Sequence, residues 1–594
     1  MIAKMKKMTL IVSEGERDTF LKSLRKAGVV HLKGIKALDF GDLHALEKDL
    51  SSVDKALEAL NGLENAHNGT PPVPGEENIL KEAIKLANTY DQKTVFEQEK
   101  NVLENKLTWF EKWGKIDIED IRLLKDAGAH IRLYELSRDE FRKLRDKDPV
   151  TLLGKDKHGM RVASISNDPE KKLPYQEVKF PPESYGSVTS RIKELDGKIE
   201  EYGVFIKNKA RLKDELEGFK RELSKKKEFL TVKYGMRDET GFSYLQGFCP
   251  AKNTDKVMRC IDAHGAGYIM DDAGDPAETP TLITNPKWID IIKPVFTFMN
   301  TLPGYDEFDI SLPFLVFFSL FFAMLVGDAG YGVLFLLMTF FARRKMKKSP
   351  PQPFHLMYLL SFGTIAWGAV TGTWFGAEGI ARLPGFNALV ISGINSFVDT
   401  NQDFMMYLCF IIGAVHLTIA HLTRGFKVIN SLRALADAGW VLVIWGMFFT
   451  AGTLIINKPF PGFAGYFLIA GTMMVLVFAN FQKNIIKGML TTLTNLPLDI
   501  IAAFADVVSY LRLFAVGYAS VIVAESFNSM AIGEGITSLA GGIIAALILF
   551  FGHALNIVLA LMAVVVHGIR LNMLEFSGHL GMQWSGKEYK PFKE

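Results

Sequence analysis

The chain has 594 residues, too many for a single hydrophobic core, so we expect two or more domains. Its net charge of +3 is nearly balanced and indicates little about partners. We expect no nucleic acid among them. The three cysteines, Cys249, Cys260 and Cys409, have unrelated spacings and predict neither a disulfide framework nor a metal site.

The distribution of charge divides the chain into two halves. Charged residues are dense from residue 1 to about 294, and beyond 312 they nearly vanish except between apolar runs. This pattern is typical of a soluble half followed by a membrane half. We therefore expect a cytosolic domain over 1–294 and a transmembrane domain with a cytosolic C-terminal tail over 295–594.

Both ends of the soluble half have an α/β pattern. A strand is expected at 8–12, a helix at 16–27 and a strand at 29–32, which indicates a βαβ beginning. The same order recurs over 242–270, so segments 1–40 and 231–275 are expected to combine beside the membrane. No glycine-rich phosphate loop joins strand to helix, so nucleotide binding is not implied. We expect no cofactor.

Between these pieces lie two long helical stretches with coiled-coil seams. Apolar residues recur every three or four positions from Leu43 to Leu60, and again from Ile192 to Ile206 with a register change before Leu212. A proline-rich break at 70–75 interrupts the first stretch. We expect an antiparallel hairpin, 42–110 with 185–230, that carries an α/β tip over 116–182. A coiled coil that dimerises is the alternative.

The membrane half contains seven apolar runs, at 312–341, 355–375, 404–422, 438–456, 463–481, 496–530 and 536–575. A single crossing by the first run would place the basic segment 343–348 outside, against the positive-inside rule. The first run is therefore predicted to break into two short helices, which gives eight helices and places the basic segments 424–433, 483–487 and 587–593 inside. The residues expected to form this structural break are Gly327, Asp328, Gly330 and Gly332.

The run 496–530 places Arg512 inside a membrane crossing. Arginine at mid-membrane costs roughly 2.5–3.5 kcal/mol on insertion scales, and it keeps its charge because its pKa exceeds about 12. A lysine could lose its proton to avoid desolvation, but an arginine cannot. We therefore expect Arg512 to meet an anion rather than lipid.

Polar stripes accompany this arginine. At 100° per residue, Ser509, Arg512 and Ser520 fall within about 80° of arc. On the last helix a second set falls within about a 100° sector, namely His553, Asn556, His567 and Arg570. Hydrogen bonding between helices explains a single serine or asparagine. Two intramembrane arginines beside polar stripes favour a functional role.

Three sequence motifs resemble those of one known family and occur in the same order along the chain as in that family. They are Ser509-Tyr510-Leu511-Arg512-Leu513, Gly327-Asp328-Ala329-Gly330-Tyr331-Gly332 and His567-Gly568-Ile569-Arg570-Leu571-Asn572-Met573-Leu574-Glu575-Phe576. The chain is thereby similar to the membrane stator subunit of V-type and A-type rotary ATPases (subunit a or subunit I), in its prokaryotic form. The resemblance covers essentially the whole chain. It implies a polytopic all-α membrane domain, whose last two helices are long and tilted, plus the elongated cytosolic α/β domain with its hairpin.

The resemblance also implies roles and partners. Arg512 would face the essential carboxylate on each proteolipid of a rotating ring, with Arg570 in support. The partners would be the proteolipid ring (c/K type), peripheral stalk subunits (E/G type), a central-stalk socket subunit (d/C type), membrane lipid and the transported H⁺ or Na⁺. The chain would be an ion-translocating subunit without catalytic activity of its own, in a prokaryotic cytoplasmic membrane. The candidate half-channel residues are Asp506, Ser509, Tyr510, Ser520, Glu525, His553, Asn556, His567 and Glu575.

This sequence departs from the eukaryotic members of the family at two positions. Ser520 stands where those members carry histidine, and Ala560 stands where they carry glutamate. Glu525 lies off the face of Arg512. The half-channel residues therefore remain candidates.

Two other functions are compatible with the sequence. A secondary ion-coupled transporter with a cytosolic regulatory domain would transport by itself, whereas a stator subunit would need its ring. A membrane-anchored coiled-coil scaffold would leave the two intramembrane arginines without a role. Copurification with a small hydrophobic subunit that carries a carboxylate would distinguish the three.

Overall fold

The computed structural model describes residues 1–33, 41–63, 76–145, 150–155, 159–239, 241–347, 349–481, 485–533, 535 and 538–593. Its contacts divide the chain into two compact units: Met1–Val12, Lys22–Lys33 and Tyr244–Lys593 in the first, and Ser13–Leu21 and Gly34–Ser243 in the second. Charge density predicts a boundary after residue 294, whereas the contacts join most of the membrane-proximal α/β strands to the apolar helices. The proline-rich break at 70–75 and part of the basic segments at 343–348 and 483–487 lie outside the described residues.

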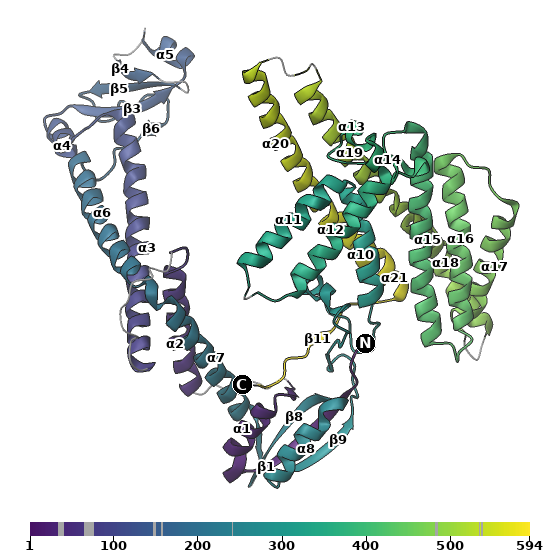
Figure 1. Ribbon diagram of the computed structural model, residues 1–594. Coiled ribbons are helices and arrows are strands. Elements are labelled where there is room, and N and C mark those ends of the chain that lie inside the picture. Colours follow the sequence, from purple (N-terminus) through teal and green to yellow (C-terminus); the bar gives the residue numbers. More distant parts are fainter. Residues whose placement is uncertain are drawn as a thin grey trace. The chain divides into compact units, whose positions relative to one another are not determined.

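The two α/β pieces of the sequence form one sheet, with strand order β2-β8-β1-β9 and β7 paired to β8. Met8 in β1 pairs with Met270 in β9 in an antiparallel register, and α8 lies against the sheet (Figure 1). Because β8 stands between β1 and β2, the first two strands are not neighbours. The elements are β1 Met5–Ser13, α1 Arg17–Ala27, β2 His31–Leu32, β7 Arg237–Glu239, β8 Phe242–Pro250, α8 Thr254–Ala263 and β9 Gly267–Asp272.

The alternation of apolar residues explains this sheet. Met8, Leu10 and Val12 are buried on one side of β1, as expected for a strand with one covered face. Cys249 and Cys260 are buried free thiols in the same domain. Burial raises the pKa of the Cys249 thiol to about 11, which makes it a packing residue rather than a nucleophile.

The second unit contains a helical hairpin. The helices α3 and α6 run side by side toward a small sheet, and α2 packs on α3 and α7 (Figure 1). Seam residues Leu46, Val53 and Leu216 are buried against this same chain. A short 3₁₀ turn at Ala210–Leu212 separates α6 from α7, where the seam changes register. The helices are α2 Gly41–Ala59, α3 Glu76–Trp113, α6 Tyr185–Asn208 and α7 Lys213–Gly235.

The tip of the hairpin is a four-stranded sheet with order β4-β5-β3-β6. The sequence indicates β3 and β5 but not the exposed strand β4 or the two-residue β6, because neither has a clear apolar alternation. The elements are α4 Ile118–Asp126, β3 His130–Leu136, α5 Arg138–Arg145, β4 Val150–Lys155, β5 Met160–Ser166 and β6 Glu177–Val178.

Among the described residues, five helices are long and apolar enough to cross a membrane: Gln352–Thr371, Gln402–Lys427, Ala434–Ile456, Ile486–Ile532 and Leu539–Leu580. The pair Ser311–Val326 and Ala329–Lys345 passes the same test only together and is bent by 118°, and Gly462–Phe478 is shorter. The protein is therefore a multi-pass membrane protein, and the count of eight membrane helices stays a prediction.

These segments correspond to α10 Ser311–Val326, α11 Ala329–Lys345, α12 Gln352–Thr371, α15 Gln402–Lys427, α16 Ala434–Ile456, α17 Gly462–Phe478, α18 Ile485–Ser509, α19 Leu511–Ile532 and α20 Leu539–Ala563. α15 packs on α16, which packs on α17 and α18 (Figure 1). α10 packs on α12 and α19, and α19 packs on α20.

The C-terminal tail joins the apolar helices to the α/β sheet within the first unit. β11 (Lys587–Glu588) runs parallel to β10 (Pro280–Thr281), and Phe592 is buried with its N–H donating to Val30 O. At the other end of the chain, the amino group of Met1 pairs with Asp309, just before α10. Both termini therefore hold the sheet beside the start of α10.

Asp328 holds the break between α10 and α11. Gly327 ends α10 in the left-handed region with φ 69°, and Asp328 is 3% exposed. One carboxylate oxygen of Asp328, Oδ1, accepts the N–H groups of Gly330 at 2.7 Å, Tyr331 at 3.2 Å and Phe375 at 2.9 Å, and the other accepts that of Gly376 at 2.9 Å. The side chain thus caps α11 and ties it to the loop after α12.

We expect Asp328→Ala to destabilise the membrane domain by ~2–4 kcal/mol, because it strands buried N–H groups at the break. Asp328→Asn should lose less, since its single amide oxygen can still accept the three bonds that Oδ1 accepts. The measurement is the midpoint of thermal unfolding in detergent, with Asp403→Ala at the exposed start of α15 as control. Equal midpoints for Asp328→Ala and the parent would contradict the assigned role.

Candidate functional site

The junction between α18 and α19 positions Arg512. Tyr510 lies between the two helices with its side chain fully buried, and its hydroxyl is 2.8 Å from Nδ1 of His416 on α15. The His416 ring is stacked between Phe317 and Phe576, with centroids 3.9 Å and 4.3 Å away. This aromatic packing fixes the backbone two residues before Arg512.

Arg512 is paired with a carboxylate of its own chain. Its Nη2 lies 2.6 Å from Oε1 of Glu575, and its Nε donates to Ser509 O at 3.0 Å. The hydroxyl of Ser509 donates to the same Glu575 oxygen at 2.7 Å. Glu575 is 4% exposed, whereas a quarter of the Arg512 side chain remains accessible. The sequence predicts an anion for Arg512 on another subunit, and the structure places one in this chain while leaving one side of the guanidinium open.

The final helix changes its winding around Arg570. π-helical segments at Val564–Gly568 and Leu571–Phe576 follow α20 and precede α21 (Ser577–Leu580). A constant 100° spacing from His553 to Arg570 is therefore wrong, because the first π segment lies between them and widens the turn. Nε of Arg570 lies 3.6 Å from Oε1 of Glu575, and 53% of its side chain is exposed. His567, in the first π segment, is partly exposed.

Five side chains form a continuous hydrogen-bonded series that we name the distal polar chain. His553 contacts Asn528 through Nε2 at 3.2 Å and Tyr331 through Nδ1 at 2.8 Å. Asn556 donates to the Tyr331 hydroxyl at 3.0 Å and accepts from Ser520 at 3.1 Å. Ser520, Asn556 and His553 are predicted candidates brought together here. The contacts of Tyr331 with His553 and Asn556 could not be predicted from residue spacing, because the break between α10 and α11 brings Tyr331 to them.

Beside His553 lies an open cavity of about 530 Å³, lined by Glu525, Asn528, Glu378 and apolar residues of α19 and α20. Glu525 is exposed in it, 13 residues after Arg512, which corresponds to about 20 Å along a helix. The distal polar chain therefore leads from this cavity toward the level of Ser520. The structure does not bring Glu525 itself to Arg512.

A second series, the proximal polar chain, lies on the other side of Arg512, toward the α/β sheet. Asp506 Oδ2 is 3.0 Å from Nε2 of His579, whose Nδ1 is 2.8 Å from Nε2 of His421. Nδ1 of His421 is 3.2 Å from Asp437, which also pairs with Arg424 at 3.2 Å. Only Asp506 is a candidate from the sequence. His421, His579 and Asp437 were missed because they lie on three different helices that only the fold brings together.

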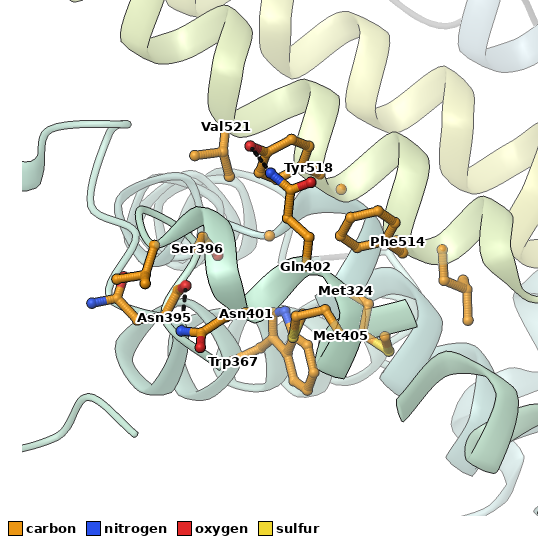
Figure 2. Close-up of a pocket in the computed structure, with 14 residues that line it drawn as sticks. Met324, Trp367, Asn395, Ser396, Asn401, Gln402, Met405, Phe514, Tyr518 and Val521 are labelled. Carbon is orange, nitrogen blue, oxygen red and sulfur yellow. Dashed lines mark hydrogen bonds between the residues drawn. The ribbon is translucent and has the colours of Figure 1, made fainter. Parts of the chain in front are cut away.

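Behind Arg512 lies a smaller pocket of about 30 Å³ (Figure 2). Its α19 residues, among them Phe514, Tyr518 and Val521, lie roughly 170° around the helix from Arg512. Gln402 donates to the Tyr518 hydroxyl at 2.7 Å across it. A volume of this size holds about one water molecule. This pocket therefore lies off the face of Arg512 and is too small for an organic solute.

Comparisons with known proteins identify the family. The chain is 31% identical to V-type ATP synthase subunit I of Borreliella burgdorferi over 617 residues, covering 100% of both chains. The chain belongs to the V-type and A-type ATP synthase subunit I family. This confirms the resemblance predicted from the Arg512, Asp328 and Arg570 motifs.

Other members of the subunit I family show graded similarity. V-type ATP synthase subunit I 1 of Treponema pallidum is 28% identical over 632 residues, with 100% of both chains covered. A-type ATP synthase subunit I of Methanocaldococcus jannaschii is 27% identical over 398 residues, covering 61% of this chain and 56% of its own. No family model matches the sequence.

One solved structure, the cytoplasmic N-terminal domain of subunit I (homolog of subunit a) of V-ATPase, is similar to part of this chain. It covers 45% of this chain and 100% of its own, at 17% identity. The TM-score of 0.24 is too low to support a structural argument.

The Arg512–Glu575 pair predicts energetic coupling between the two side chains. Arg512→Met alone leaves the buried carboxylate with only the half-exposed Arg570, 3.6 Å away, and Glu575→Gln alone leaves the cation without its anion. We expect each to cost ~2 kcal/mol or more, and the double variant to cost less than their sum. The measurement is the thermal midpoint in detergent of all four proteins, and a strictly additive double variant would contradict a stable pair.

Proposed function

We propose that this member of the subunit I family is the membrane stator of a V/A-type rotary ATPase or ATP synthase. In this function it forms two ion half-channels against a proteolipid ring, with its N-terminal domain and C-terminal tail in the cytosol. The observation that supports it most strongly is Arg512, a permanent cation oriented by buried Glu575 on a face that stays partly open.

The surroundings of Arg512 favour an apolar partner that carries a carboxylate. In an apolar 18-residue stretch of the final helix only 22% is buried, against 44% in such a stretch of α15. Ala515 and Ala519 on α19 are exposed and small, so that a neighbouring helix could approach closely. Lipid alone is a poor neighbour for Arg512, because a cation facing hydrocarbon is costly. A proteolipid with one acidic side chain satisfies both requirements.

The pair with Glu575 suggests how Arg512 serves a passing carboxylate. A ring carboxylate reaches the stator neutral, with its ion bound, and must release that ion beside Arg512. A cation 4 Å away stabilises the ionised state by about 4 kcal/mol at an effective dielectric of 20. While Arg512 turns to the ring, Arg570 is close enough to Glu575 to compensate the carboxylate. Glu575 thus orients Arg512 between visits.

The positions of the two polar chains on either side of Arg512 support a role for them as half-channels. In this proposal the distal chain with its cavity opens to the outer side, and the proximal chain opens to the cytosol. The charge of Arg512 between them repels a cation that would otherwise pass directly. Each elementary charge that crosses 100 mV exchanges about 2.3 kcal/mol with the field, and rotation of the ring couples this energy to ATP.

The remaining partners follow from the family. The hairpin of α2, α3, α6 and α7 would dock on peripheral stalk subunits and resist torque, and a central-stalk socket subunit would lie near the ring. The curated relatives are named as subunits of ATP synthases, so we assign this chain to such a complex and expect no catalysis by the chain alone.

The test uses the assembled complex, purified and reconstituted in vesicles. Arg512→Ala should abolish ATP-driven ion uptake while the ring still copurifies, because ring carboxylates can no longer ionise at the stator. Arg344→Ala, which removes an exposed arginine near the end of α11, is the matched control and should pump like the parent.

The outcomes separate the alternatives. Pumping by the Arg512→Ala complex would contradict the stator function. Ion transport by the chain alone in vesicles, without a ring, would instead support a secondary transporter. Loss of thermal stability with unchanged pumping would favour a scaffold.

A further inference from the structure

We propose that the proximal polar chain is a proton relay, so that the ion delivered from the side of the α/β sheet is H⁺. This inference rests on the proposed function and specifies its ion. It concerns Asp437, His421, His579 and Asp506, of which three have no role in the stator model derived from the sequence.

The chain has the alternation that a relay requires. It runs acid, imidazole, imidazole, acid, with contacts of 3.2, 2.8 and 3.0 Å. Both nitrogens of each imidazole are engaged along the series, so each ring can accept a proton on one side and release one from the other. Asp437 and His421 are 3% and 2% exposed, which keeps bulk water from bypassing this part of the series.

One proton passes along the series in three transfers. The proton of neutral Asp437 moves to Nδ1 of His421, the Nε2 proton of His421 moves to Nδ1 of His579, and the Nε2 proton of His579 moves to Asp506. Three bonds to hydrogen break and three form, and a single proton is transferred from Asp437 to Asp506. Both rings end in the other tautomer, and each returns to the first when Nδ1 loses its proton to water and Nε2 gains one from water.

The two ends of the relay lie where entry and exit are possible. At the start, Asp437 meets Arg424, whose side chain is 44% exposed and also donates to His579 O. At the end, the Asp506 side chain is 33% exposed. Asp506 lies three residues, or about 4.5 Å of helix rise, before Ser509, which bonds Glu575. A proton on Asp506 is therefore one helical turn from the candidate site.

The geometry does not suit a metal ion or Na⁺. Two imidazole nitrogens bound to one tetrahedral metal at about 2.05 Å would be roughly 3.3 Å apart, whereas those of His421 and His579 are 2.8 Å apart. Hard cations such as Na⁺ prefer several oxygen ligands, and the middle of this series offers only nitrogens. Arg424 contacts this series at its start, where it pairs with Asp437 at 3.2 Å.

The experiment measures ATP-driven acidification of vesicles that contain the reconstituted complex. His421→Gln and His579→Gln should each reduce the rate of acidification at least ~10-fold, because glutamine bonds but does not relay protons. His355→Gln, on an exposed position of α12, is the matched control and should not change the rate. The residual rate of the relay variants should fall further in D₂O than that of the parent, since proton transfer has become limiting.

If a buried histidine variant fails to assemble, Asp506→Asn provides the test, because the side chain of Asp506 is one-third exposed. Parental acidification by assembled Asp506→Asn overturns the relay, and so does ATP-driven Na⁺ uptake in place of acidification. If Arg512→Ala is inactive while the relay variants pump normally, the relay alone fails. If Arg512→Ala also pumps, the proposed function fails with it.

Discussion

The ion pair between Arg512 and Glu575 is the interaction on which the membrane half depends. An arginine cannot discharge itself in an apolar medium, so the fold must supply an anion. Glu575 does so with one buried oxygen, which also accepts from Ser509. Because Glu575 is buried and Arg512 is a quarter exposed, the pair holds the cation in place without covering it. The proposed stator function needs both properties at once.

Other features of the first unit bring polar groups toward that pair from two directions. The break at Asp328 turns α11 so that Tyr331 joins the distal polar chain, and the end of the final helix places His579 against His421. Gly517 lets α19 pack closely on α10, since a Cβ there would come within 2.4 Å of Met324 O. The proximal polar chain reaches α18 at Asp506, before Arg512, and the distal polar chain reaches α19 at Ser520, after it.

Much of the fold could be predicted from local sequence patterns. The contacts between residues far apart in the sequence could not. Seam spacing indicates the hairpin helices, and three glycines around Asp328 indicate a bend, because both depend on neighbouring residues. The partner of Arg512 is 63 residues away, and a constant helical spacing fails at the π segments beside Arg570. Tyr331, Asp437, His421 and His579 each acquire a partner only through packing. A single sequence therefore identifies the arginine but not the side chains that hold it or lead to it.

A structure of the assembled complex, determined with the ring in place, would show whether Arg512 faces the ring carboxylates. The measured quantity is the distance from the Arg512 guanidinium to the carboxylate of the nearest ring subunit. The proposed function predicts a ring carboxylate within ~4 Å of Arg512, with Glu575 either still beside Arg512 or shifted toward Arg570. An Arg512 that is enclosed by its own chain, with the ring carboxylates passing elsewhere, would contradict it.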